Sequence, residues 1–235
     1  MTRVLVPVAI LERGAVSSGL ASLLSTTDVT VLGYHVLPEQ TPPDQARAQY
    51  EERAVSALED IVEEFAAAGG DAEFRLVFTH DREKTIDRVA DETGSTAYVI
   101  TGTTGDVDRL LVPLAGDVAV DRILGFVTEL IGDREIDVTL LLAVDDEATD
   151  EGRTLLENAA ERLTEQGIGT TTTLSSDRPF DALVDALPSH DAVVMGETAP
   201  SLTSLLLGDV EERVADATVG PVLVVRAVDS PSPSR

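Results

Sequence analysis

The sequence predicts an α/β protein built from two doubly wound, parallel-sheet units in tandem. Short apolar runs alternate along the chain with helical stretches, which is the pattern of parallel strands joined by helical crossovers. The apolar runs are continuous, as in strands that are covered on both faces. The whole pattern then starts again near residue 109, which indicates an internal duplication.

The first half contains four expected strands with helices between them. The strands are expected over residues 3–9, 29–36, 72–78 and 98–100, and the helices over residues 15–24, 45–68 and 82–93. The helix over 45–68 has the clearest pattern, because Leu58, Ile61 and Phe65 recur at helical spacing and glycines follow at once.

The second half repeats this order and extends it. Residues 109–115 match residues 3–9 almost one for one, and residues 137–141 resemble residues 28–32. Five strands are expected over residues 109–115, 137–141, 170–174, 192–195 and 222–225, and helices over residues 150–166, 180–187 and 205–217.

The two units are therefore unequal. We place the first unit at residues 1–108, the second at 109–228 and a disordered tail at 229–235. The first unit has no counterpart of the last helix and strand, so one edge of its sheet should be free. Because free sheet edges pair readily with other strands, we expect this edge to be covered within the tandem pair or by a second chain.

The charge balance is strongly acidic, with 43 Asp and Glu residues against 17 Lys and Arg, for a formal net charge of −26. Such a surface repels nucleic acid and anionic lipid, so neither is expected as a partner. The acidic residues are spread along the chain, which favours a solvated surface adapted to molar salt. The sequence thus predicts a halophilic host, such as a halophilic archaeon.

Several functional classes are disfavoured by composition. The chain has no cysteine, so disulfides and thiolate chemistry are excluded. No apolar run reaches the ~18–20 residues of a membrane span, and the first residues do not resemble a signal peptide. We therefore expect a cytoplasmic protein without membrane insertion.

The sequence offers no recognisable catalytic or metal centre. His35, His80 and His190 are scattered and have no adjacent metal-binding partner, and the acidic cluster over 145–151 lacks the spacing of a calcium loop. No nucleophile is paired with a base, so we expect neither an enzyme nor a bound metal.

The repeated strands, the long helix ended by glycine and the segment over 204–226 together resemble the universal stress protein family over nearly the whole chain. The resemblance implies a Rossmann-like fold of the adenine nucleotide alpha hydrolase-like type, and members that form dimers or tandem pairs. One branch of that family binds ATP through a glycine loop that is followed by Ser or Thr. Glycines in such a loop let backbone N–H groups approach phosphates.

This sequence departs from the ATP loop. Gly196 matches the first glycine, but Ala199 occupies the second position and the spacing to Gly208 is one residue short. Asp209 replaces the hydroxyl residue and places a carboxylate where a phosphate would lie. Ligand-binding members tend to carry Asp after the first strand, where this chain has Ala9 and Ala115.

We expect a non-enzymatic stress-response protein that has lost nucleotide binding and acts through a protein partner or self-association. An intramolecular pseudo-dimer is expected, and a homodimer is compatible with it. The alternative is an ATP or small-molecule sensor whose crevice is formed by Pro113, Ala115, Val144, Gly196, Ala199, Gly208 and Asp209. A further alternative is a soluble regulatory partner of a membrane transporter. No cofactor is expected, and ATP is disfavoured.

Overall fold

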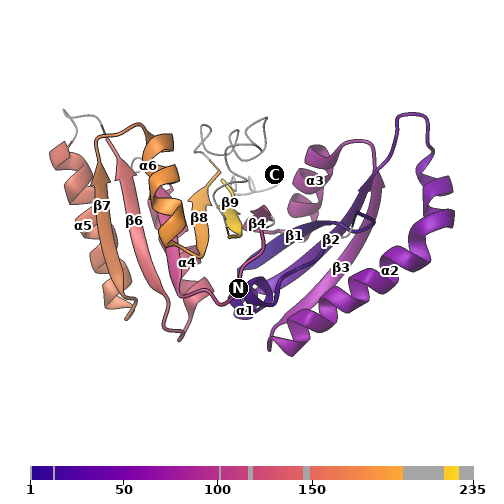
Figure 1. Ribbon diagram of the computed structural model, residues 1–235, viewed down its shortest axis with the longest axis horizontal. Coiled ribbons are helices and arrows are strands. Elements are labelled where there is room, and N and C mark those ends of the chain that lie inside the picture. Colours follow the sequence, from indigo (N-terminus) through magenta and orange to yellow (C-terminus); the bar gives the residue numbers. More distant parts are fainter. Residues whose placement is uncertain are drawn as a thin grey trace, which may run out of the picture.

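The computed structural model describes residues 2–12, 14–100, 102–115, 119–144, 149–197 and 220–227. In this part of the chain nine strands form one sheet in the order β3-β2-β1-β4-β9-β8-β5-β6-β7 (Figure 1). The strands are β1 (Arg3–Ala9), β2 (Asp28–Val36), β3 (Asp71–Thr79), β4 (Ala97–Ile100), β5 (Arg109–Leu114), β6 (Asp137–Ala143), β7 (Thr170–Ser175), β8 (Ala192–Gly196) and β9 (Val222–Val225). The predicted α/β fold class with a mostly parallel sheet is confirmed.

Helices cover both faces of this sheet. They are α1 (Ser18–Leu24), α2 (Pro43–Ala67), α3 (Arg82–Thr93), α4 (Val120–Ile131), α5 (Thr149–Glu165), α6 (Pro179–Ala186) and the short 3₁₀ helix η2 (Leu187–Ser189). The apolar faces of α1, α2, α4 and α5 share one large core with the sheet. Two smaller cores form on the opposite face, one beneath α6 and one beneath α3.

Several helix boundaries differ from the sequence prediction for identifiable reasons. Helix α1 begins at Ser18 rather than at residue 15, because the Ser17 hydroxyl accepts a hydrogen bond from the Leu20 N–H and caps the helix. Helix α2 begins at Pro43 rather than at residue 45, since the first helical position needs no N–H donor. Helix α4 was not predicted at all, and the expected helix over 205–217 lies outside the described residues, as does the tail over 229–235.

Strand β9 joins the two halves of the sheet. It pairs in parallel with β8 and antiparallel with β4, with Ala97 opposite Val225 and Ile100 opposite Val222. The order β4-β1-β2-β3 on one side of β9 is repeated as β8-β5-β6-β7 on the other. The free edge expected in the first half is therefore covered from within the chain. The two halves share one continuous sheet.

The side chain of Arg134 holds α1 and α4 together beneath this sheet. Its Nη1 donates to the Ser22 carbonyl (2.5 Å), its Nη2 to the Leu23 carbonyl (2.8 Å) and its Nε to the Ile131 carbonyl (3.1 Å). Its Nη2 also donates to Leu130 O. Carbonyls at a helix C-terminus lack intrahelical donors and attract cations, so one guanidinium serves the ends of both helices.

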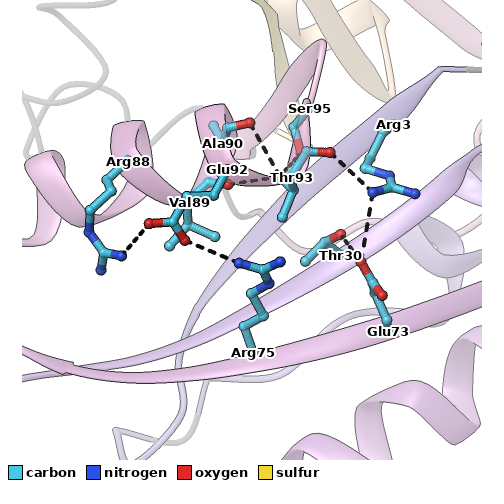
Figure 2. A network of polar contacts seen from close by, with 10 residues as sticks. All are labelled: Arg3, Thr30, Glu73, Arg75, Arg88, Val89, Ala90, Glu92, Thr93 and Ser95. Carbon is cyan, nitrogen blue, oxygen red and sulfur yellow. Dashed lines mark hydrogen bonds and ion pairs between the residues drawn. The ribbon is translucent and has the colours of Figure 1, made fainter.

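An ion-pair network lies on the face of the first half that α3 covers (Figure 2). Arg75 on β3 and Arg88 on α3 both bind the Glu92 carboxylate, at 3.1 and 2.8 Å. Nearby, Glu73 of β3 lies 3.9 Å from Arg3 and accepts a hydrogen bond from the buried Thr30 hydroxyl. The outer strand β3 therefore carries charged side chains of both signs.

Candidate functional site

The carboxyl ends of β5, β6 and β8 define the candidate site. Strand β5 lies between the other two and runs parallel to both. Ala115 follows β5, Val144 follows β6 and Gly196 ends β8, so these three predicted site residues lie at one edge of the sheet. A doubly wound sheet binds ligands at such an edge, where neighbouring strands continue in opposite directions.

Strands β5 and β8 separate as they approach this edge. Their pairing covers only Leu110 and Leu111 of β5, whereas the pairing of β5 with β6 continues to Leu114. Pro113 is buried beyond the last residue that pairs with β8. A proline is tolerated there because no pairing with β8 remains for its missing N–H to interrupt. Pro113 therefore lies where the pairing of β5 with β8 has ended.

The side chains at the three strand ends offer little polar chemistry. Ala115 is exposed, Val144 is half-buried and Gly196 is buried. Helix α5 approaches Val144 closely at Gly152, where a Cβ would lie 3.0 Å from the Val144 Cγ1. None of the three residues has a side chain that could hydrogen-bond to a base or a ribose. Ala199, Gly208 and Asp209, the other predicted residues, lie outside the described residues.

Polar groups at this edge include several that the sequence did not single out. Helix α4 starts after Ala119, whose φ of 69° is left-handed and which makes no side-chain cap. A helix N-terminus without a cap favours anions. In the first turn of α4, the Arg122 Nη1 donates to the Arg226 carbonyl at 3.1 Å. The first turn of α4 also carries Asp121, which pairs with Arg162, so charges of both signs lie at this helix N-terminus.

A negative side lies next to Gly196. The Glu197 N–H donates to the Val225 carbonyl (2.9 Å), and the Glu197 carboxylate accepts from the Ala227 N–H (2.8 Å). Burial and then the neighbouring carboxylate of Glu197 raise the pKa of Tyr98 on β4 to about 12. Burial also raises the pKa of Asp87 on α3, with Glu197 adding to the effect. Two carboxylates and a half-buried phenol thus border this side.

Arg226 lies between the two halves of the molecule. Its side chain is only 14% exposed and its Nη2 forms an ion pair with Asp91 of α3 at 2.8 Å. Its Nη1 donates to the Ser95 carbonyl at 3.4 Å. This cation is therefore directed towards the first half. The sequence could not identify it, because its position depends on where β9 enters the sheet.

The matching edge of the first half is closed by a turn. After Ala9, the Ile10 N–H donates to the Tyr34 carbonyl (3.2 Å), and the N–H groups of Glu12 and Gly14 donate back to the Ala9 carbonyl. Ile10 is buried in the main core. At Gly14 a Cβ would lie 2.6 Å from Val8, so the turn sits directly against the strand end. The backbone acceptor at Ala9 is therefore already occupied.

No helix among the described residues has the length and apolar character needed to cross a membrane. Likewise, within the described ranges no group of three or more His, Asp or Glu side chains is placed to hold a metal ion.

The sheet order, with strands continuing in opposite directions from β5 and β8, defines a doubly wound α/β protein with a Rossmann-like fold. A family profile identifies the particular class: residues 106–226, just over half of the chain, match the universal stress protein family. The chain belongs to the universal stress protein family.

One solved structure agrees on the fold over nearly the whole chain, and others match about half of it. A universal stress protein from Archaeoglobus fulgidus superposes with a TM-score of 0.65 at 17% identity, and the match covers 97% of each chain. A family member from Burkholderia pseudomallei matches 51% of this chain and 96% of its own, at 24% identity and a TM-score of 0.42. An Archaeoglobus fulgidus universal stress protein in complex with dAMP matches 50% of this chain and 96% of its own, at 20% identity and a TM-score of 0.39. No curated protein sequence matches the chain.

Proposed function

We propose that the chain is a tandem universal stress protein that catalyses no reaction, holds no nucleotide and acts by associating with a protein. The observation that carries this proposal is the chemistry of the crevice. Its strand ends present Ala115, Val144 and Gly196, and the next side chain, Glu197, is a carboxylate. Such a crevice gives a nucleotide few hydrogen bonds and repels its phosphates.

The proposal includes the setting in which the protein works. A net charge of −26 supports a cytoplasm with molar salt, where screening reduces the repulsion within the chain. The mirrored strand order on the two sides of β9 supports a tandem pair in which each half contributes one unit to a pseudo-dimer.

Nucleotide or small-molecule sensing is the second candidate function. The uncapped N-terminus of α4 and the nearby Arg122 favour it, since both attract an anion to the end of β5. A helix N-terminus contributes about 0.3–1 kcal/mol, and a carboxylate ~4 Å from a phosphate opposes it by about 1 kcal/mol in water. These opposing effects are similar in size. Whether an anion binds therefore depends on the carboxylates of Glu197 and Asp209.

Calorimetric titration of ATP, with and without Mg²⁺, into the full chain in molar KCl distinguishes the two functions. We expect no heat of binding at millimolar ATP from protein whose circular dichroism shows that it is folded. A micromolar dissociation constant that weakens in Arg122→Ala would overturn the proposal and favour the sensor.

Two further variants test why the crevice excludes nucleotide. Asp209→Ser replaces the carboxylate in the loop by a hydroxyl, and Glu197→Gln removes the charge next to Gly196. If the carboxylates exclude ATP, the double variant should gain measurable binding. If it stays silent, the lack of hydrogen-bonding side chains at Ala115 and Val144 is the stronger cause. Capture of the cytoplasmic domain of a transporter would support the regulatory alternative.

A further inference from the structure

The two outer edges of the nine-stranded sheet differ in chemistry. On one side β3 carries Asp71, Glu73 and Arg75, and its charges take part in the network of Figure 2. On the other side β7 has the sequence Thr-Thr-Thr-Thr-Leu-Ser, with neither charge nor proline. Proteins protect outer strands with charges, prolines or bulges, because a bare edge pairs with other strands. In a chain with a net charge of −26, the neutral edge of β7 is therefore an exception.

The hydrogen-bond pattern shows which groups this edge presents. The Val138 N–H donates to the Gly169 carbonyl, and the Val144 N–H donates to the Ser175 carbonyl. Parallel ladders use every second residue of a strand, so residues 169, 171, 173 and 175 direct their backbone groups towards β6. Thr170, Thr172 and Leu174 consequently direct their N–H and C=O groups outwards, with Thr172 in the middle.

The side chains along the edge are accessible as well. Thr171, Thr172 and Thr173 are exposed. Thr171 shares a hydrogen bond with Thr139 on one face of the sheet. On the other face, Thr172 and Leu174 line a groove of about 540 Å³ against Leu156 of α5. The outer strand thus has a mostly polar groove, which Arg153 and Glu157 also line, beside a row of outward-facing backbone groups.

We propose that β7 pairs antiparallel with β7 of a second copy of this chain, which extends the sheet across a two-fold axis at Thr172. In this register Thr172 exchanges hydrogen bonds with Thr172 of the second copy, and Thr170 does so with Leu174 of the second copy. Thr171 and Thr173 then face each other between these pairs, and opposed threonines stabilise antiparallel strands. This proposal rests on the proposed function in one respect: it names a second copy of the chain as the protein with which the chain associates.

Charge favours a second copy as the occupant. The opposed strands are identical and uncharged, so the pairing of the two strands brings no like charges together, although Arg153 and Glu157 of α5 line the groove beside it. The chain already uses the same kind of joint, because β4 and β9 unite its two halves as antiparallel edge strands. Each copy carries a net charge of −26, and screening by molar salt is needed before two copies approach. The dimer should therefore dissociate as KCl is lowered.

Sedimentation of the full chain in molar KCl tests the proposal with matched proline variants. Thr172→Pro removes an outward N–H and leaves the bonds to β6 in place, because the N–H of Thr172 does not point to β6. The control is Ala72→Pro on the other outer strand, β3, where Ala72 is the counterpart of Thr170 and its N–H likewise points away from the neighbouring strand. We expect the wild type and Ala72→Pro to sediment as dimers, and Thr172→Pro to sediment at half that mass with an unchanged circular dichroism spectrum.

Crosslinking gives an independent readout, because the chain contains no cysteine. Thr172→Cys should be converted to a covalent dimer by a short bifunctional maleimide, and Ala72→Cys should not. A wild type that is monomeric at every salt concentration overturns the proposal, as does a dimer that survives Thr172→Pro or crosslinks through Ala72→Cys. If the chain does not self-associate but binds an added β-strand peptide at this edge, the proposal is overturned and the edge belongs to another partner. None of these outcomes depends on the ATP titration.

Discussion

Replacement of Arg134 by methionine tests whether one side chain joins the two halves of the molecule. The substitution keeps the length of the side chain and removes the guanidinium, which donates to carbonyls at the C-termini of α1 and α4. All of these acceptors are neutral oxygens, so the interaction differs from an ordinary surface ion pair. Burial also lowers the pKa of Arg134, which indicates that the group is partly removed from water.

The expected loss of stability follows from these contacts. A hydrogen bond from a charged donor contributes about 1.5–3 kcal/mol. Because Arg134 is half-buried, water can replace some of its contacts, and we count only those to Leu23 and Ile131. At the lower bound for each, Arg134→Met should cost about 3 kcal/mol. For a chain of this size that corresponds to a fall in Tm of about 6–12 °C.

Urea unfolding followed by circular dichroism in molar KCl measures this loss. The control is Arg178→Met, because the Arg178 side chain is 90% exposed and lies 3.8 Å from Asp181. An exposed ion pair of this kind should change the free energy of unfolding by less than about 0.5 kcal/mol. If Arg134→Met were as stable as Arg178→Met, the inference that Arg134 fastens α1 to α4 would be wrong.

Two further predictions concern glycines and Tyr98. In Gly19→Ala the new Cβ would lie 1.7 Å from the Gly105 carbonyl oxygen, so we expect the free energy of unfolding in urea to fall by about 1–3 kcal/mol. In Gly125→Ala the new Cβ has nothing within 4 Å, so we expect the free energy of unfolding to rise by about 0.5–1 kcal/mol. A stable Gly19→Ala would show that residues 102–108 do not pack on α1. Because the pKa of Tyr98 is raised to about 12, ultraviolet titration of the folded protein should show one tyrosine that ionises near pH 12. This step should be absent in Tyr98→Phe. Unfolded tyrosine ionises near 10, so Tyr98 makes the folded state lose stability as the pH rises from 10 towards 12.

Much of the fold was predictable because local sequence determines it. Eight strands, β1 to β8, lie where the sequence pattern and the repeat had placed them, and β9 lies at the predicted residues 222–225. Helix α4 was missed although the repeat itself points to it, because the helix expected over residues 15–24 occupies the same place between the first two strands of the first half. Its buried Ile123, Val127 and Leu130 do recur at helical spacing and would have revealed it.

The arrangement of strands was harder to predict. Apolar runs identify strands but not their neighbours, so the insertion of β9 between β4 and β8 could not be derived from them. The same limit applies to the site. Ala115, Val144 and Gly196 were predicted because they end strands, whereas Glu197 and Arg226 belong to it through contacts across the joint. Thr170–Ser175 was correctly predicted as a strand, but its exposure depends on its position at the edge.

The position of β9 has a consequence during synthesis on the ribosome. Strand β4 ends at Ile100, but the strand that covers its edge begins at Val222. At ~5–20 residues per second, the intervening chain takes about 6–24 s to make. For that time β4 pairs only with β1, and its other edge is open to pairing with other chains. Synthesis of nearly the whole protein must therefore precede completion of its first half.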